Sequence, residues 1–225
     1  MIKYHGTPIT PMKIFNESVI NRNVLIPFTK TQDLKRALKI CNKIIIDNGA
    51  YTLWRQGGEI DWDKYYSFLE DIKDKIEFFF IPDVIDGTEK ENDKLIDDYL
   101  KTYFKNGVPI WHVNESFERL ENMIKKFDYI AIGSAGEYRD LGTFKWHRRM
   151  NDVMSVLCNE DGTPKVKIHM LRCLDPKIFM RYPFHSGDST NLAQNHARDG
   201  WKNILNRIEP FNSPLKYGEI GGLFA

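Results

Sequence analysis

Cysteine is scarce and scattered in this sequence of 225 residues. The three cysteines, Cys41, Cys158 and Cys173, lie far apart and form no Cys-x-x-Cys pair. Small secreted domains depend on dense cysteines, and structural zinc sites depend on paired ones. The sequence therefore predicts neither a disulfide framework nor a cysteine zinc site, and it favours a reducing cytoplasm.

Other absences narrow the class of protein. No apolar run approaches the roughly 20 residues of a membrane span, and the first residues do not resemble a signal peptide. The formal net charge of +1 excludes a strongly basic nucleic-acid coat, although it allows a local basic surface. No G-x-G-x-x-G follows the first expected strand, so the dinucleotide-binding fold lacks its usual signature. We expect no membrane partner, and the sequence leaves the oligomeric state open.

What the chain does have is a series of short apolar segments that each end in a polar cluster. Such runs are typical of strands buried on both faces of a parallel sheet. The expected strands are 2–5, 23–28, 43–47, 77–82, 108–113, 129–133, 166–171 and 182–186. Helical spacing occupies 33–41, 62–75, 88–105, 116–126, 146–157 and 195–208, and Asp175-Pro176 marks one more helix start. The alternation predicts an α/β fold, a compact (β/α)8 TIM barrel formed by residues 1–225 as a single catalytic domain, with an open doubly wound sheet or a partial barrel as alternatives.

The polar clusters hold the candidate functional residues, because a barrel keeps its active site at the carboxyl ends of its strands. These ends carry His5, Asp47, Asp83, His112, Gly133-Ser134, His169 and Asp188. Two carboxylates beside an anomeric carbon can break a glycosidic bond, one as nucleophile and one as proton carrier. A third can accept two hydrogen bonds from a guanine-type edge, while glycines let backbone N–H groups approach a carbonyl oxygen. Against this interpretation, an aspartate at a strand end is often only a helix cap.

The order of these motifs resembles that of the tRNA-guanine transglycosylase superfamily, most closely its short phage-type branch that inserts 7-deazaguanines into DNA. Asp47-Asn48-Gly49-Ala50-Tyr51 is similar to the family's Asp-Ser-Gly-Gly-aromatic segment. Gly133-Ser134-Ala135-Gly136-Glu137 resembles its base-binding glycine loop, and Ser186-Gly187-Asp188-Ser189 follows in the expected order. The resemblance covers roughly residues 43 to 195 and rests on short motifs.

The resemblance implies a role for each carboxylate. Asp188 would be the nucleophile, Asp47 the general acid and base, and Asp83 the reader of the base. His112 stands where the family usually has a glutamine, which leaves that contact open. The implied substrate-binding residues are Asp83, Tyr51, His112, Gly133, Ser134, Gly136, His169 and Met170. Tyr51 would stack on a flat ring, and the chemistry needs no metal or redox cofactor.

The implied substrates are DNA, single-stranded or with a flipped-out guanine, and a free 7-deazaguanine base such as 7-cyano-7-deazaguanine. Family members that act on tRNA carry a Cys-x-Cys-x-x-Cys…His zinc site after the nucleophile, and the sequence has none, so we expect a barrel without the zinc-binding subdomain. The host cytoplasm would be the location of such a phage enzyme, and its chemistry would be related to that of queuosine. Four alternatives stay open: an RNA-acting transglycosylase, a simple N-glycosidase, a metal-dependent barrel hydrolase, and a non-catalytic binding module.

A basic and aromatic segment follows the sixth expected strand. It runs from Tyr138 into the start of the helix expected over 146–157 and contains Arg139, Lys145, Arg148 and Arg149. Lysine and arginine supply most phosphate contacts, and interleaved aromatic residues suit single-stranded nucleic acid. We therefore expect these four cations to contact nucleic acid, although an ordinary solvated helix start has the same composition.

Overall fold

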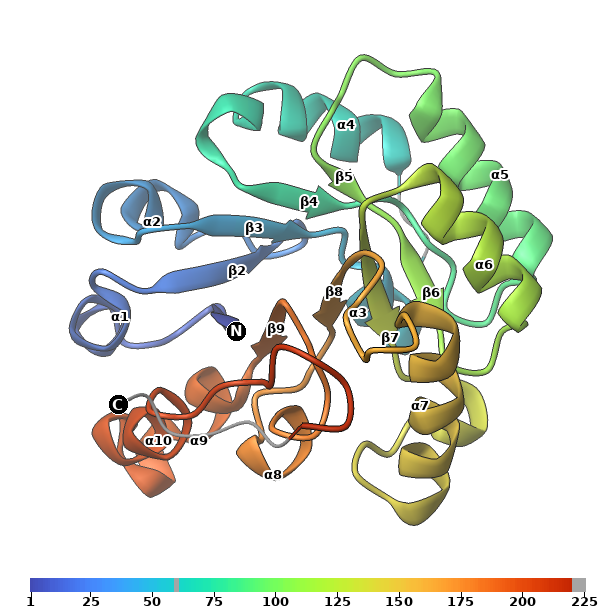
Figure 1. The fold of residues 1–225 in the computed structure, drawn as a ribbon. Coiled ribbons are helices and arrows are strands. Elements are labelled where there is room, and N and C mark those ends of the chain that lie inside the picture. Colours follow the sequence, from blue (N-terminus) through green and yellow to red (C-terminus); the bar gives the residue numbers. More distant parts are fainter. Residues whose placement is uncertain (59–60, 220–225) are drawn as a thin grey trace. The chain divides into compact units, whose positions relative to one another are not determined.

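The computed structural model of the protein describes residues 1–58 and 61–219 (Figure 1). Its elements in chain order are β1 (Ile2–Gly6), α1 (Met12–Val19), β2 (Asn23–Pro27), α2 (Leu34–Ile40), β3 (Ile44–Asp47), α3 (Ala50–Gln56), α4 (Trp62–Glu70), η1 (Lys73–Lys75), β4 (Phe78–Phe80), α5 (Glu89–Leu100) and β5 (Gly107–Val108). They continue as β6 (Ile110–His112), α6 (Phe117–Lys126), β7 (Tyr129–Gly133), η2 (Gly136–Tyr138), α7 (Phe144–Leu157), β8 (Lys167–Met170), α8 (Pro176–Phe179), β9 (Ser186–Ser189), α9 (Asn191–Asp199) and α10 (Trp201–Ile208).

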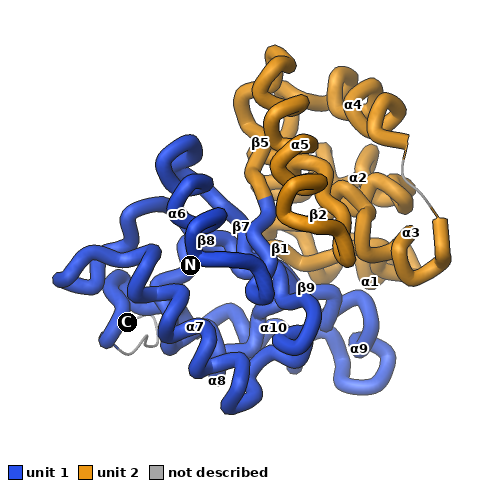
Figure 2. The backbone as a smooth tube through the Cα atoms, turned by 90° about the vertical axis from the view of Figure 1, so that its right-hand side faces the viewer, with its two compact units in different colours: residues 1–3, 110–225 blue, residues 4–109 orange. Residues whose placement is uncertain are grey.

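The chain divides into two compact units, shown in separate colours in Figure 2. Unit 1 contains residues 1–3 and 110–225, and unit 2 contains residues 4–109. One boundary crosses β1 after Lys3, and the other lies between β5 and β6 after Pro109. The prediction that residues 1–225 form one catalytic domain stays a prediction.

The strands pair in parallel in the order β5-β4-β3-β2-β1-β9-β8-β7-β6. Unit 2 holds the pairs from β1 to β5, and unit 1 holds β6 with β7, β7 with β8 and β8 with β9. In unit 1 the first residues also join β9, because the Ile2 N–H donates to the His185 carbonyl at 2.9 Å. Parallel strands in sequential order, with helices in nearly all of the connections, define an α/β TIM-barrel-like fold, and the predicted fold class is confirmed.

Aromatic packing fixes β4 within unit 2. The Phe79 ring meets Tyr65 of α4, Tyr99 of α5 and Phe104 with centroid distances of 6.2, 6.0 and 5.5 Å. The Tyr65 hydroxyl also donates to the Phe80 carbonyl at 2.8 Å, so this buried hydroxyl has a hydrogen-bond partner. The Phe78–Phe80 run is therefore core, as its apolar sequence predicts, and it fixes where the chain leaves β4 toward Asp83.

Unit 1 is built around tryptophans from a strand and a helix. Trp111 of β6 and Trp146 of α7 are both fully buried, and α6 and α7 lie side by side in Figure 1. The amphipathic spacing of α7 places Met150, Val153 and Met154 in the same core. The indole Nε1–H of Trp146 donates to the Ser134 hydroxyl at 2.9 Å, so the helix also holds the segment that follows β7.

Several element boundaries differ from those predicted. The strand expected at 182–186 begins only at Ser186, because Pro183 has no N–H and the Phe184 N–H closes a local turn onto the Tyr182 carbonyl at 2.8 Å. The helix expected over 195–208 is two helices separated at Gly200, whose φ of 75° ends the first. The strand expected over 108–113 is divided at Pro109, which cannot donate to a ladder.

Other differences concern helix length and number. The helices expected over 62–75 and 88–105 end at Glu70 and Leu100, and the sequence did not predict α1 or α3. The capping box of α5 is confirmed, since Thr88 and Glu91 each accept from the other's backbone N–H. Among the described residues no helix is both long and apolar enough to cross a membrane.

The N-cap of α7 offers a test of this local structure. The exposed Thr143 hydroxyl accepts from the Trp146 N–H at 3.2 Å, so Thr143→Ala leaves one helix N–H without its cap. We expect a loss of about 1 kcal/mol in the free energy of unfolding, measured by urea denaturation. Ser155→Ala, on the exposed face of the same helix, is the control and should be neutral or slightly stabilising. Equal effects of the two changes would contradict the capping role.

Candidate functional site

Asp188 is the best-positioned carboxylate of unit 1. It is the third residue of β9 and its side chain is 7% exposed. Its Oδ1 accepts from the His169 Nε2 at 3.1 Å and from the Arg172 N–H at 3.1 Å. No described residue is recorded as a donor to Oδ2. One oxygen is therefore fixed by two donors, and the described residues supply none to the other.

Arg172 reaches Asp188 through an uncommon backbone conformation. Its φ is +60°, in the left-handed region that residues other than glycine rarely adopt. This conformation costs on the order of 1 kcal/mol. The strain sits at the turn after β8, where the peptide N–H is donated to the Asp188 carboxylate.

Behind Asp188 lies a buried chain of polar side chains. The His169 Nδ1 lies 2.5 Å from the Ser186 hydroxyl, and that hydroxyl lies 2.6 Å from the hydroxyl of Tyr129. His169 and Ser186 are both 0% exposed. Ser186, His169 and Asp188 thus have the connectivity of a Ser-His-Asp triad, but a serine without solvent access cannot attack a substrate.

Strand register brings these side chains to one face. Ser186 pairs with His169, and His169 pairs with Ala131, so all three point to the same side of the sheet. Two residues after Ala131 on β7, Gly133 pairs with His112 of β6. A Cβ on Gly133 would lie 2.9 Å from the His112 Cδ2, so glycine is required for the imidazole to occupy its place.

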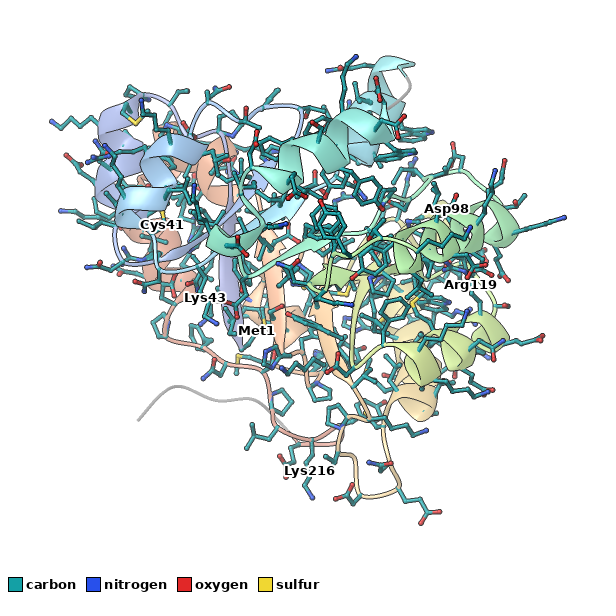
Figure 3. All side chains as sticks on the ribbon, turned by 90° about the horizontal axis from the view of Figure 1, so that it is seen from above. Met1, Cys41, Lys43, Asp98, Arg119 and Lys216 are labelled. Atoms are coloured by element: carbon teal, nitrogen blue, oxygen red, sulfur yellow. The ribbon has the colours of Figure 1, made fainter. Side chains whose placement is uncertain are left out.

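His112 is held by a buried carboxylate that the sequence did not single out. The Glu115 Oε2 accepts from the His112 N–H at 2.7 Å, and its Oε1 lies 3.4 Å from the His112 Nδ1. Arg119, on α6 and labelled in Figure 3, donates from Nη1 to the same carboxylate at 2.5 Å. Burial alone would raise the pKa of Glu115, but the His112 hydrogen bond and the Arg119 charge outweigh it, and the net pKa is lowered.

The segment after β7 holds the predicted glycine loop. Gly133 ends the strand, Ser134 accepts from Trp146, and Gly136 has a φ of +54° beside the Asn114 side chain. Met170 is buried at the end of β8 and pairs with Gly187 of β9. Unit 1 therefore gathers the predicted residues toward the carboxyl ends of its strands or just beyond them: His112, Gly133, Ser134, Gly136, His169, Met170 and Asp188.

Unit 2 carries the other two predicted carboxylates. Asp47 is the last residue of β3, and its Oδ2 accepts from the Gly49 N–H at 3.1 Å. Asp83 is 4% exposed just beyond β4, and its Oδ1 accepts from the Asn48 Nδ2 at 2.7 Å. The Asn48 amide also donates to the Ile81 carbonyl at 2.9 Å and accepts from the Ala50 N–H at 2.9 Å. Asn48 is thus a fixed link between the ends of β3 and β4.

The start of α3 adds an aromatic pair to this cluster. Tyr51 is 40% exposed and lies 5.8 Å from the Trp54 ring, which is 47% exposed. The Trp54 Nε1 donates to Asp86 at 2.7 Å, which fixes the indole orientation while leaving ring surface accessible. Tyr51 therefore has the exposure that a stacking role requires. Another predicted strand-end residue of this unit, His5 near the end of β1, is buried at 1% exposure.

The four predicted nucleic-acid-binding cations differ in their surroundings. The Arg149 guanidinium donates to the Val113 and Glu115 carbonyls at 2.9 and 2.6 Å and lies 3.9 Å from the Phe117 ring centroid. These contacts give Arg149 a structural role. The exposed Lys145 pairs with Glu137, and the exposed Arg139 lies 3.8 Å from Asp140. Arg148 is exposed, with no recorded ion pair to a described residue, which makes it the strongest candidate for a phosphate contact.

Two further observations concern other kinds of site. No group of three or more His, Cys, Asp or Glu suited to a metal ion occurs within residues 1–58 and 61–219. A hollow of about 610 Å³ in unit 1 lies beside the last turns of α7 and the 158–165 segment, and none of the predicted site residues lines it. The sequence did not single out Asn48, Glu115, Arg119, Arg172 or Ser186 for a role; Asn48 and Ser186 lay within the quoted motifs, whereas the others carried no signal.

Glu115 gives a prediction with a defined pH dependence. An acid whose pKa is lowered on folding stabilises the folded state above its ordinary value, here 4.5, and that stability is lost as pH falls through the folded pKa. Glu115→Gln leaves the Arg119 charge buried without its carboxylate, which we expect to cost about 3 kcal/mol at pH 7. The difference in the free energy of unfolding between Glu115→Gln and the natural protein, measured by urea denaturation, should decrease below pH 4.5. Glu118→Gln, exposed on the same helix, is the control, and a gap that stays constant with pH would contradict the assignment.

Comparison with known proteins shows a likeness of fold. No family model matches the chain, and no curated protein matches it. One solved structure, from Aquifex aeolicus VF5 and described as a structural study of "Project ID", aligns with a TM-score of 0.56 at 14% sequence identity. The alignment covers 93% of this chain and 90% of that chain. At this identity the likeness supports the fold and carries no statement about activity.

Proposed function

We propose that the protein is a base-exchanging transglycosylase that replaces guanine in DNA with a 7-deazaguanine through a covalent glycosyl-aspartate on Asp188. The observation that carries the proposal is the geometry of Asp188, whose Oδ1 is held by two donors while Oδ2 is left for the substrate. A carboxylate oriented in this way is suited to attack at an anomeric carbon. The resemblance of the strand-end motifs to the transglycosylase family supplies the substrate class.

The reaction consists of two displacements. In the first, the Asp188 Oδ2 attacks C1′ of the target nucleotide, the C1′–N9 bond breaks, and its electron pair leaves with guanine, which takes a proton from Asp47. In the second, Asp47 removes the N9 proton of the incoming 7-deazaguanine, whose nitrogen attacks C1′ and releases Asp188. Each proton given is taken back, and two inversions retain the anomeric configuration.

Base recognition is assigned to Asp83 and to the loop from Gly133 to Gly136. A carboxylate accepts two N–H groups of the guanine edge, and backbone N–H groups donate to the base carbonyl. Asp83 is suited to such a task because Asn48 fixes its Oδ1. The exposed Tyr51 would stack on a base. The roles of Asp47 and Asp83 come from the resemblance and depend on chemical tests.

The macromolecular substrate would be single-stranded DNA or a duplex from which the target base is flipped, because C1′ chemistry is hindered inside a stacked helix. DNA is preferred to tRNA as the acceptor because the strand-end motifs most closely resemble the short phage-type branch of the family. The proposed location is the cytoplasm, the host's if a phage encodes the enzyme. The free 7-deazaguanine base is the second substrate.

The nucleophile is tested by Asp188→Asn, which keeps the oxygen that accepts from His169 and Arg172 but removes the negative charge. We expect exchange of labelled guanine into DNA to fall by about a thousandfold or more, and the denaturation-resistant protein–DNA adduct to disappear. Asp175→Asn, which retains a good N-cap for α8, is the control and should exchange normally. Exchange by Asp188→Asn at the natural rate would refute the assignment, and parallel reactions with DNA and tRNA would identify the acceptor.

The phosphate contact is tested by Arg148→Ala. We expect weaker DNA binding on all sequences and a reduction of about one in the slope of log affinity against log salt concentration. Arg36→Ala, an exposed arginine of α2, should leave the slope unchanged. A salt titration followed by fluorescence anisotropy makes the comparison, and identical slopes for Arg148→Ala and the natural protein would remove Arg148 from the interface.

A further inference from the structure

We propose that Ser186 and Tyr129 are positioning residues that act on Asp188 through His169, by holding its imidazole as the neutral tautomer protonated on Nε2. The kinetic part of this inference rests on the proposed function of Asp188. The tautomer itself does not, and it can be measured without a substrate.

The contacts form one continuous line through unit 1. Tyr129 opens β7, Ser186 opens β9, His169 lies in the middle of β8, and Asp188 is two residues after Ser186. The successive heavy-atom distances are 2.6, 2.5 and 3.1 Å. The line therefore runs from the amino ends of the strands toward the carboxyl ends, and it stops at the proposed nucleophile.

The donors and acceptors in this line have one consistent arrangement around a neutral imidazole. An ionised carboxylate only accepts, so the His169 Nε2 must carry the proton directed at the Asp188 Oδ1. The Nδ1 of a neutral ring then accepts, which requires Ser186 to donate its hydroxyl proton. Ser186 in turn accepts from the Tyr129 hydroxyl. In this arrangement the three donated protons, from Tyr129, Ser186 and His169, all point along the line toward Asp188.

The strand register supplies the donor for Nδ1. His169 is 0% exposed. Ser186 lies directly beside it in register, so its hydroxyl reaches Nδ1 without a bridging water. The neighbour on the other side is Ala131, whose small side chain leaves that side of the imidazole uncrowded.

This arrangement determines how Asp188 can react. The fixed Nε2–H, together with the Arg172 N–H, keeps Oδ1 occupied and prevents rotation of the carboxylate. Oδ2 is then the attacking atom in every turnover. Loss of the Ser186 donor would allow the ring to carry its proton on Nδ1, which turns Nε2 into an acceptor facing a carboxylate.

The test combines a spectroscopic measurement with kinetics. In protein labelled with ¹⁵N-histidine, we expect a one-bond proton coupling at the His169 Nε2 and none at Nδ1. Ser186→Ala should increase the Nδ1–H population and lower kcat roughly five- to tenfold with little change in KM, and Tyr129→Phe should have the same effect in weaker form. Tyr66→Phe is the control, because the Tyr66 hydroxyl is buried without a hydrogen-bond partner among the described residues.

Three results would overturn the proposal: an Nδ1–H ring, a doubly protonated ring in the natural protein, or a Ser186→Ala variant with an unchanged tautomer and rate. Failure of the proposed function is separately recognisable. If the natural protein exchanges no guanine into any nucleic acid, the glycosyl-aspartate is refuted, while the coupling at Nε2 still decides the tautomer.

Discussion

The parallel register of β7, β8 and β9 is the constraint on which the polar chemistry of unit 1 depends. In this register Ala131, His169 and Ser186 are neighbours on one face, two residues before Gly133 and Asp188 on their own strands. A slip of one residue in any strand would turn its polar side chains to the opposite face. The pairing that satisfies the backbone hydrogen bonds thus also aligns the Asp188 carboxylate, the His169 imidazole and the Ser186 hydroxyl. The sequence needs only small residues beside them, and these are Ala131 and Gly133.

Two different strategies keep charged groups in the protein interior. Around Glu115 the negative charge is balanced by Arg119 and by hydrogen bonds from His112, and the lowered pKa of Glu115 reports that balance. Around Asp188 the recorded donors are an imidazole nitrogen and a peptide N–H. The first arrangement suits a permanent structural link between β6 and α6. In the second, both donors meet Oδ1, and Oδ2 has no donor among the described residues.

The sequence predicts the fold class because continuous apolar runs between helical segments leave few other solutions. It also locates the strand-end aspartates, since their position after an apolar run is visible without a structure. It does not predict the start of β9, because the apolar character of Tyr182 and Phe184 hides the turn that Pro183 imposes. Nor does the sequence reveal the hydrogen-bond partners of Asp188 and His112. Arg172 acts through its backbone, and Glu115 through a fold-dependent contact, so neither leaves a sign in residue type or spacing.

The link between β1 and β9 has a consequence for how the chain assembles. Every other strand pairing joins strands adjacent in sequence, but the Ile2 N–H meets the His185 carbonyl from the far end of the chain. The loop that this contact closes is by far the longest in the sheet, and its entropic cost is correspondingly the largest. During synthesis Ile2 leaves the ribosome well before His185, so the amino end of β1 gains this partner only after the residues between the two have been made. A residue that is made early is thus among the last to gain its strand partner.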